Sequence, residues 1–244
     1  MRTISRVSAA FLLLDGRDKS PILGASILVD GVRRKMVAKG DGHYVFSNLE
    51  PTAHVYDISA SGYHPARRTL GADPEALPEI IPMQYAPDSL KLRSIPHYRL
   101  QFCSGGRPLA DTEICVELQT PVGALRLVEP ARKGECRLTL GGGYAAAFLY
   151  QPFKAGKAEI MATGFDRAEG CYELQRALDA DLPEGTLLRP FWRLSTDGRG
   201  TAILPLLGAL MQRDELEFGF AWGGNTAALR AAVPDGACPF TVAL

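Results

Sequence analysis

The sequence predicts an all-β protein built from two β-sandwich domains in series, and three observations support this fold class. The 244 residues include 25 Gly and 17 Pro, so turn-forming residues recur at short intervals. The segments between them are short and rich in β-branched, aromatic and leucine residues, which is typical of sandwich strands. Hydrophobic residues make up 46% of the chain and charged residues 22%, a balance that allows a packed core.

The first third of the chain contains six short segments with the composition of strands. They are Val7–Leu14, Gly24–Val29, Lys35–Val37, Tyr44–Phe46, Val55–Ala60 and Arg67–Thr69. The connections between them, such as "DGRDKSP" and "SGYHP", place Gly, Pro, Asn or Asp where turns need them. Alternation puts Tyr44 and Phe46 on one face, with Tyr56 and Ile58 facing the same core across a hairpin.

The stretch from Gly71 to Pro96 carries five prolines, which separate the first domain from the second. Proline cannot donate a hydrogen bond into a sheet ladder, so this stretch predicts a final edge strand followed by an extended linker. We therefore expect a first sandwich over residues 1–86, a linker over 87–96 and a second sandwich over 97–244.

The second domain is expected to be an immunoglobulin-like or related sandwich. Two strands are expected within "HYRLQFCSGGRPLADTEICVEL" (97–118), and further strands at Ala124–Val128, Cys136–Leu140, Ala158–Ala162, Phe191–Ser195, Thr201–Leu206, Leu216–Ala221 and Phe240–Leu244. In Ala168–Leu182, good helix formers accompany Cys171, Leu174 and Leu178 near positions i, i+3 and i+7. This spacing predicts a short helix or helical turn.

One stretch of the first domain, "GDGHYVFSNLEPTAHVYDISASGYHP" (40–65), resembles a known family. The residues that carry the resemblance are Asp41-Gly42, Tyr44, Phe46, Asn48-Leu49, Pro51, Ile58 to Ala60 and Gly62-Tyr63, preceded by "PILGASILVDG". Together they look like the carboxypeptidase regulatory-like domain, also described as a transthyretin-like (prealbumin-like) β-sandwich, over roughly residues 5 to 85. The resemblance implies a fold and little about activity, because the module occurs attached to many different partners.

The sequence contains none of the catalytic or metal-binding motifs of enzymes built on such sandwiches. The histidines at 43, 54, 64 and 97 form neither the H-x-H pair of intradiol dioxygenases nor the H-x-x-E motif of zinc carboxypeptidases. The chain ends in "PFTVAL" and not in the Tyr-Arg-Gly-Ser tail of the transthyretin-like hydroxyisourate hydrolases. The five cysteines are irregularly spaced without C-x-x-C, which is typical of reduced thiols. We therefore expect a non-enzymatic protein without a cofactor or a metal site.

Two groups of side chains remain as a candidate binding surface. His43 and His54, expected on the outward side of the hairpin, are the best remaining pair for a metal or for catalysis, although surface histidines without a third ligand are usually bystanders. A second group of aromatic residues has the rings that could stack on a sugar. They are Tyr144, Tyr150, Phe153, Trp192 and Trp222. Core packing is the favoured interpretation of these five.

Charge and hydropathy restrict the classes of partner and the cellular location that we expect for this protein. Lys plus Arg equals Asp plus Glu at 27 each, so the chain has no overall attraction for nucleic acid or anionic lipid. The apolar run Ala9–Leu14 has only six residues, fewer than a signal peptide needs, and no window approaches a membrane span. We expect a cytoplasmic protein whose partners are other protein subunits.

These expectations together favour a structural or binding module that makes protein–protein contacts within a larger assembly. A phage-tail-like or contractile injection particle would suit sandwich domains that lack a secretion signal. A carbohydrate-binding β-sandwich protein is one alternative. An unrecognised enzyme that uses the glycine-rich segment Gly141–Phe153 as a substrate loop is another.

Overall fold

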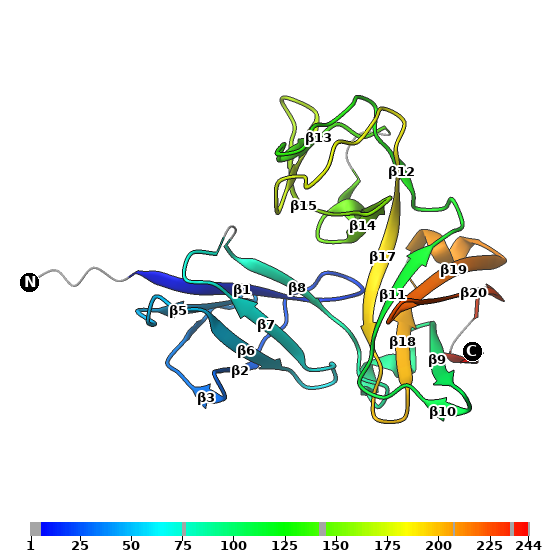
Figure 1. The fold of residues 1–244 in the computed structure, drawn as a ribbon, viewed down its shortest axis with the longest axis horizontal. Helices are drawn as coiled ribbons and strands as arrows, with labels where there is room; N and C mark the ends of the chain where they lie inside the picture. Colours follow the sequence, from blue (N-terminus) through cyan, green and yellow to red (C-terminus); the bar gives the residue numbers. More distant parts are fainter. Residues whose placement is uncertain (1–5, 75–76, 142–144, 207, 235–236, 244) are drawn as a thin grey trace, which may run out of the picture. The chain divides into compact units, whose positions relative to one another are not determined.

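A computed structural model describes residues 6–74, 77–141, 145–206, 208–234 and 237–243 of the chain (Figure 1). Over these residues the protein is almost entirely β, with three short 3-10 helices, and its sheets pack as sandwich-like layers. The chain divides into two compact units, Met1–Lys91 and Leu92–Leu244. In the part of the chain that the structure describes, no helix has the length and apolar character needed to cross a membrane.

The first unit consists of two four-stranded sheets. One sheet has the order β4-β5-β1-β8 and the other β3-β2-β6-β7. The strands are β1 (Val7–Asp15), β2 (Ser26–Val29), β3 (Val32–Arg33), β4 (Val37–Ala38), β5 (His43–Ser47), β6 (His54–Ser59), β7 (Ala66–Leu70) and β8 (Glu79–Met83). All neighbouring strands are antiparallel except β1 and β8, which are parallel.

Aromatic side chains from both sheets meet in the core of the first unit. The rings of Phe11 on β1 and Tyr56 on β6 lie 4.9 Å apart between centroids, and Phe46 on β5 lies 5.7 Å from Tyr56. Along β5 and β6 buried residues alternate with more exposed ones, as a strand with one buried face requires. The inward orientation predicted for Tyr44, Phe46, Tyr56 and Ile58 is therefore confirmed.

The predicted hairpin between these two segments is wrong. Strand β5 pairs with β1 and β4, whereas β6 pairs with β2 and β7 in the opposite sheet. The connection between them begins at Asn48, which has a left-handed φ of 58° and accepts a hydrogen bond from the Arg6 amide on its Oδ1 atom at 3.0 Å. Alternation shows which side of a strand is buried, and two strands can face one core from opposite sheets as well as from one.

The segment 87–96 also differs from the extended linker predicted for it. It contains a 3-10 helix, η1 (Leu90–Ser94), in which Leu92 is buried. The predicted strand Lys35–Val37 is also displaced, because only Val37 of this range belongs to an observed strand, β4.

The second unit contains one sheet in which β9 pairs with β18 and β10 antiparallel and with β21 in parallel. A larger sheet has the order β13-β16-β15-β14-β17-β11-β19-β20, and β12 also pairs with β17. The strands are β9 (His97–Ser104), β10 (Arg107–Pro108), β11 (Glu113–Leu118), β12 (Leu125–Arg126), β13 (Arg137–Leu138), β14 (Pro152–Ala155), β15 (Ala158–Asp166), β16 (Cys171–Leu174), β17 (Leu187–Ser195), β18 (Thr201–Pro205), β19 (Glu215–Trp222), β20 (Asn225–Ala232) and β21 (Ala237–Ala243). Two further 3-10 helices are η2 (Ala146–Phe148) and η3 (Gly208–Gln212).

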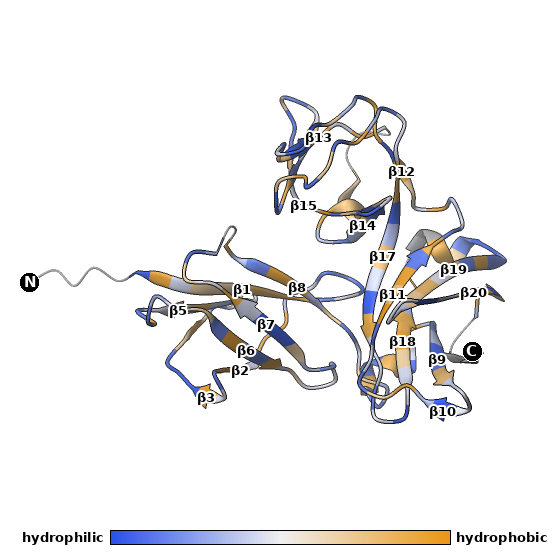
Figure 2. Ribbon diagram, in the orientation of Figure 1, coloured by the Kyte–Doolittle hydropathy of each residue, from blue (hydrophilic) through white to orange (hydrophobic). Residues whose placement is uncertain are grey.

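The second unit has two hydrophobic cores. The sandwich core unites Tyr98, Phe102, Phe218 and other buried residues of β9, β11, β18 and β19. Figure 2 shows the matching alternation of apolar and polar residues along β19, which also alternates between buried and exposed positions. A smaller lobe, which the sequence does not predict, surrounds a separate core formed by residues between Leu127 and Leu188. Strand β17 belongs to both the lobe and the sandwich. It pairs with β12 and β14 of the lobe near its start and with β11 of the sandwich further along (Figure 1).

The helix predicted within Ala168–Leu182 is also wrong. Residues Cys171–Leu174 form strand β16, which pairs with β15 and β13. Leu178 is buried in the core of the lobe, and its amide donates a hydrogen bond to the Glu135 carbonyl at 2.9 Å. The apolar residues whose spacing suggested one buried face of a helix therefore lie on a strand and on the irregular segment that follows it.

Gly200, before β18, has no room for a side chain. Its φ is +74°, and an added Cβ would lie 2.6 Å from the Phe102 carbonyl oxygen and 3.0 Å from the Leu109 nitrogen. We expect Gly200→Ala to lower the free energy of unfolding of the second unit by about 2 kcal/mol, from the left-handed backbone and the backbone clash. This free energy is measured by chemical denaturation with tryptophan fluorescence as the signal. The control is Gly198→Ala, where an added Cβ meets nothing within 4 Å, and an equal loss in both variants would contradict the prediction.

Candidate functional site

A buried carboxylate lies at the centre of a polar cluster in the first unit. The side chain of Asp15, at the end of β1, is 3% exposed. Its Oδ2 atom accepts a hydrogen bond from the Tyr63 hydroxyl at 2.7 Å, and the Tyr85 hydroxyl lies 2.8 Å from Oδ1 and 2.7 Å from Oδ2. The Arg17 amide donates to Oδ1 at 2.8 Å. We call Asp15, Tyr63, Tyr85 and Lys91 the Asp15 cluster.

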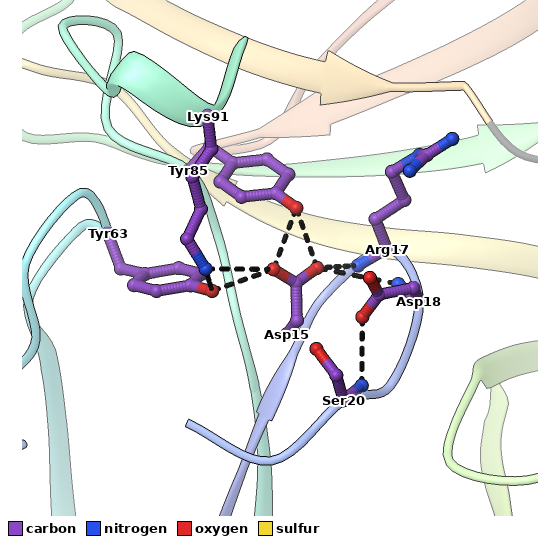
Figure 3. A network of polar contacts seen from close by, with 7 residues as sticks. All are labelled: Asp15, Arg17, Asp18, Ser20, Tyr63, Tyr85 and Lys91. Atoms are coloured by element: carbon purple, nitrogen blue, oxygen red, sulfur yellow. Dashed lines mark hydrogen bonds and ion pairs between the residues drawn. The ribbon is translucent and has the colours of Figure 1, made fainter. Parts of the chain in front are cut away.

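Lys91 joins the cluster from the side of Tyr63 (Figure 3). Its Nζ atom donates to the Tyr63 hydroxyl at 2.5 Å and lies 3.7 Å from Asp15 Oδ2. The ammonium also lies 4.6 Å from the centroid of the Tyr63 ring, within the range of a cation–π contact. The rings of Tyr63 and Tyr85 are stacked, with centroids 5.5 Å apart and planes inclined by 18°.

Local backbone geometry brings the four side chains together. Gly62 adopts a φ of +81° in the turn before Tyr63, and its carbonyl accepts the Ala86 amide at 3.1 Å. Tyr63 and Tyr85 form an isolated antiparallel bridge, so their side chains project in parallel toward Asp15. The Gly16 amide donates to the Met83 carbonyl at 2.9 Å and ties the turn after β1 to the end of β8.

The electrostatics of the cluster favour protonated hydroxyls. Burial raises the pKa of both Tyr63 and Tyr85 well above the usual range, and their hydrogen bonds to Asp15 raise it further. Nearby, burial lowers the pKa of Lys19 to about 8. The Lys19 Nζ atom donates to the Gly16 carbonyl at 2.8 Å, so this side chain holds the same turn.

The Asp15 cluster is suited to joining chain segments. Both carboxylate oxygens accept hydrogen bonds, and the tyrosine hydroxyls act as donors whose high pKa disfavours a role as general bases. The cluster links the end of β1, the turn before β7, the segment after β8 and the start of η1. From the sequence, Asp15 and Tyr63 are expected only in separate turns. No local pattern reveals that Tyr63 and Tyr85, 48 and 70 positions after Asp15, converge on it.

The candidate pair His43 and His54 is not brought together by a shared hairpin. His43 lies on β5 with its Nδ1 atom 2.9 Å from Asp41 Oδ1, whereas His54 lies on β6 in the other sheet. The His54 ring joins two turns, since its Nδ1 atom lies 2.6 Å from Asp30 Oδ2 and its Nε2 atom 3.0 Å from the Glu50 carbonyl. Across the described residues, no group of three or more His, Cys, Asp or Glu side chains could hold a metal ion.

The His54–Asp30 pair makes the first unit sensitive to pH. The hydrogen bond to Asp30, and secondly that to the Glu50 carbonyl, raises the pKa of His54 above its ordinary 6.5. A raised folded-state pKa stabilises the fold fully below pH 6.5, and this contribution is lost as the pH rises through the folded-state pKa. By NMR titration we expect a His54 midpoint above 6.5 that falls in Asp30→Asn. The matched control, Asp57→Asn on β6, should leave the midpoint unchanged; an identical midpoint in Asp30→Asn would contradict the assignment.

Most of the candidate aromatic platforms are core residues. Phe153 packs against Phe148 at 4.6 Å in the core of the lobe, and Trp192 and Trp222 are buried in the sandwich core. These three rings are 3–6% exposed and therefore offer no surface for stacking on a sugar. Tyr150 is half-buried with a left-handed φ of 61°, and Tyr144 lies outside the described residues.

A second feature with a potential to bind is the outer edge of β20. This strand pairs with β19, and the described part of the chain provides no strand on its other side. Its eight residues, "NTAALRAA", contain a single charged side chain, Arg230, whose Nη2 atom forms an ion pair with Glu215 at 2.7 Å. A long edge strand with small side chains is a template for pairing with another strand.

Comparisons with known proteins leave the family open. No protein-family model matches the chain, and no curated protein matches it. One solved structure with a weak likeness is the Bacillus anthracis TIE protein, at 8% sequence identity and a TM-score of 0.28. The alignment covers 98% of this chain and 50% of that chain, so the present chain spans half the length of that structure.

Proposed function

We propose that this chain is a non-enzymatic module that binds other protein subunits within a larger assembly. The observation that carries the proposal is the open edge of β20, at eight residues the longest strand at a sheet edge in the described part of the chain. The main-chain groups of such an edge supply hydrogen bonds to an added strand, a common mode of protein–protein recognition.

The other edge strands carry features that discourage pairing, which makes the contrast with β20 informative. Strand β7 presents Arg67 and Arg68, and the strands β8, β18 and β21 contain Pro82, Pro205 and Pro239. The remaining strands with one partner have only two residues each; they are β3, β4, β10, β12 and β13. Charges, prolines and short length are the devices by which sandwich proteins protect their edges. On β20 the one charge is neutralised by Glu215 on the neighbouring strand, and there is no proline.

The Asp15 cluster supports a structural role for the first unit. Its polar groups bond to one another and fix the segments after β1, before β7 and after β8, which would hold the loops of the sandwich in place for a partner. The resemblance of residues 5–85 to a carboxypeptidase regulatory-like domain agrees with this role, since such modules occur beside many partners.

We further propose a setting for the assembly. Sandwich domains in series and free cysteines at Cys103, Cys115, Cys136 and Cys171 suit a protein that stays in the reducing cytoplasm and is incorporated there into a particle. A phage-tail-like or contractile injection particle is the setting that we favour.

Co-expression tests this function. The full chain is produced with the products of its neighbouring genes, and complexes are separated by size-exclusion chromatography and viewed by negative-stain microscopy. We expect wild type to enter a larger complex and Ala228→Pro on β20 to be lost from it. Arg67→Ala on the protected edge β7 is the control and should remain bound. A wild-type chain that stays apart from every neighbour would overturn the proposal.

A further inference from the structure

The β19–β20 hairpin determines which backbone groups of β20 point outward. Its turn consists of Gly223 and Gly224 alone, with φ of 50° and 85°, and pairs Trp222 with Asn225. A two-residue hairpin closes with a hydrogen-bonded pair, and such pairs alternate along an antiparallel ladder. At the far end, the Val233 amide donates to the Asp214 carbonyl at 2.9 Å, in phase with this alternation. The odd-numbered residues of β20 therefore bond to β19.

The even-numbered residues direct their N–H and C=O groups away from β19. The side chains of these residues, Thr226, Ala228 and Arg230, are all exposed on the outer face of the sheet. The next in the series, Ala232, has a carbonyl that accepts the Tyr98 hydroxyl at 2.8 Å, so the sandwich itself closes this end of the edge. The open edge thus consists of six backbone groups, three donors and three acceptors, centred on Ala228.

We propose that β20 pairs antiparallel with β20 of a second copy of this chain, about a two-fold axis that passes by Ala228. This inference rests on the proposed function and names one partner for the same edge. In this register Ala228 lies opposite its own equivalent, and Thr226 lies opposite Arg230 of the second copy. All six outward groups then form hydrogen bonds, because the three residues are symmetric about the axis.

The side chains of β20 suit this register. On the inner face, half-buried Leu229 faces Ala227 of the second copy, so apolar surface at the margin of the sandwich core becomes covered. On the outer face, Ala228 meets Ala228 without steric conflict. The two Arg230 residues are separated by four strand positions, about 13 Å, and each is neutralised by its own Glu215. The interface therefore brings no like charges directly opposite each other.

Sedimentation equilibrium of the purified full chain tests the pairing. We expect wild type to form a dimer of twice the 26.4 kDa chain mass. Ala228→Pro should weaken dimerisation by at least about tenfold, because it removes one central donor from each copy. Its φ suits an edge strand whose N–H points outward, so circular dichroism should show an unchanged fold. Arg230→Ala, which keeps the backbone, should still dimerise. A wild-type chain that stays monomeric over the whole concentration series overturns the inference.

A disulfide test gives the register independently of the proline variant. Directly opposed hydrogen-bonded residues have Cα atoms about 5.5 Å apart, within the reach of a disulfide. Ala228→Cys should therefore yield a covalent dimer on mild oxidation. Thr226→Cys, whose equivalents are about 13 Å apart in this register, should not. Wild type controls for the native thiols, and cross-linking of Thr226→Cys in preference to Ala228→Cys would exclude the register.

The two proposals fail in different ways. If the purified chain is monomeric but Ala228→Pro abolishes entry into a complex with neighbouring gene products, another protein occupies the edge; self-pairing is then wrong and the proposed function stands. If neither association is found, both are wrong.

Discussion

Replacing Asp15 by alanine is expected to lower the free energy of unfolding of the first unit by about 3–5 kcal/mol, because it removes a buried acceptor and leaves two buried hydroxyl donors unsatisfied, at about 1–3 kcal/mol each. The substitution would leave the Tyr63 and Tyr85 hydroxyls, the Arg17 amide and the Lys91 ammonium without their shared acceptor. The two hydroxyl groups would remain protonated donors without an acceptor, because burial raises the pKa values of Tyr63 and Tyr85 well above the usual range.

The measurement must distinguish the stability of the first unit from that of the second. Both tryptophans, Trp192 and Trp222, lie in the second unit, so their fluorescence reports on that unit alone. Hydrogen exchange detected by mass spectrometry follows the first unit directly, and we expect faster exchange in β1 and β8 of Asp15→Ala with little change in the tryptophan transition.

Two further variants make this prediction specific. Asp18→Ala removes an exposed carboxylate from the same turn and should cost much less. Asp15→Asn keeps one acceptor oxygen and should lie between the two. A loss below about 1 kcal/mol in Asp15→Ala, the level of an ordinary exposed pair, would show that the cluster contributes little to stability.

The second large effect is expected for Phe102→Ala in the sandwich core of the second unit. Phe102 is fully buried and makes edge-on contacts with Phe220 and Trp222, with ring centroids 5.5 and 5.9 Å apart. Truncation of a buried Phe costs about 3–5 kcal/mol, through lost burial and the cavity left behind. Because Trp222 packs against Phe102 in this core, chemical denaturation monitored by tryptophan fluorescence measures the loss.

The matched control is Glu217→Ala, at an exposed position of β19 beside the same core. It should change the free energy of unfolding by no more than about 0.5 kcal/mol. Equal denaturation midpoints for Phe102→Ala and Glu217→Ala would mean that the packing around Phe102 is unimportant for the stability of the unit.

The sequence was sufficient to predict the all-β class and the buried faces of individual strands, because alternation is local. Tyr44 and Phe46 are buried as predicted, yet β5 pairs with β1 and not with β6. Which strands become neighbours depends on segments distant in sequence, and the turn after β5 turns the chain toward the other sheet. The Asp15 cluster could not be predicted for the same reason, since its members are separated by up to 76 positions, from Asp15 to Lys91.

Strand β20 shows a different limit of prediction from sequence, because here the local composition favours the wrong secondary structure. No strand is predicted for "NTAALRAA", because alanine, leucine and arginine favour helices and the segment lacks β-branched or aromatic residues apart from Thr226. The local signal was the preceding Gly223-Gly224 pair, which favours a two-residue hairpin turn. Pairing with β19 over eight residues then overrides the helical preference.

The course of β17 has a consequence for the modularity of the second unit. The lobe lies between two positions, Glu117 and Phe191, that are themselves paired in the β11–β17 ladder. A chain in which residues 119–189 were replaced by a short hairpin turn would retain all the strands of the sandwich, and only Val122 would be missing from its core. The lobe therefore has the topology of an insertion between β11 and β17, and we expect the sandwich, with its edge at β20, to fold when the lobe is removed.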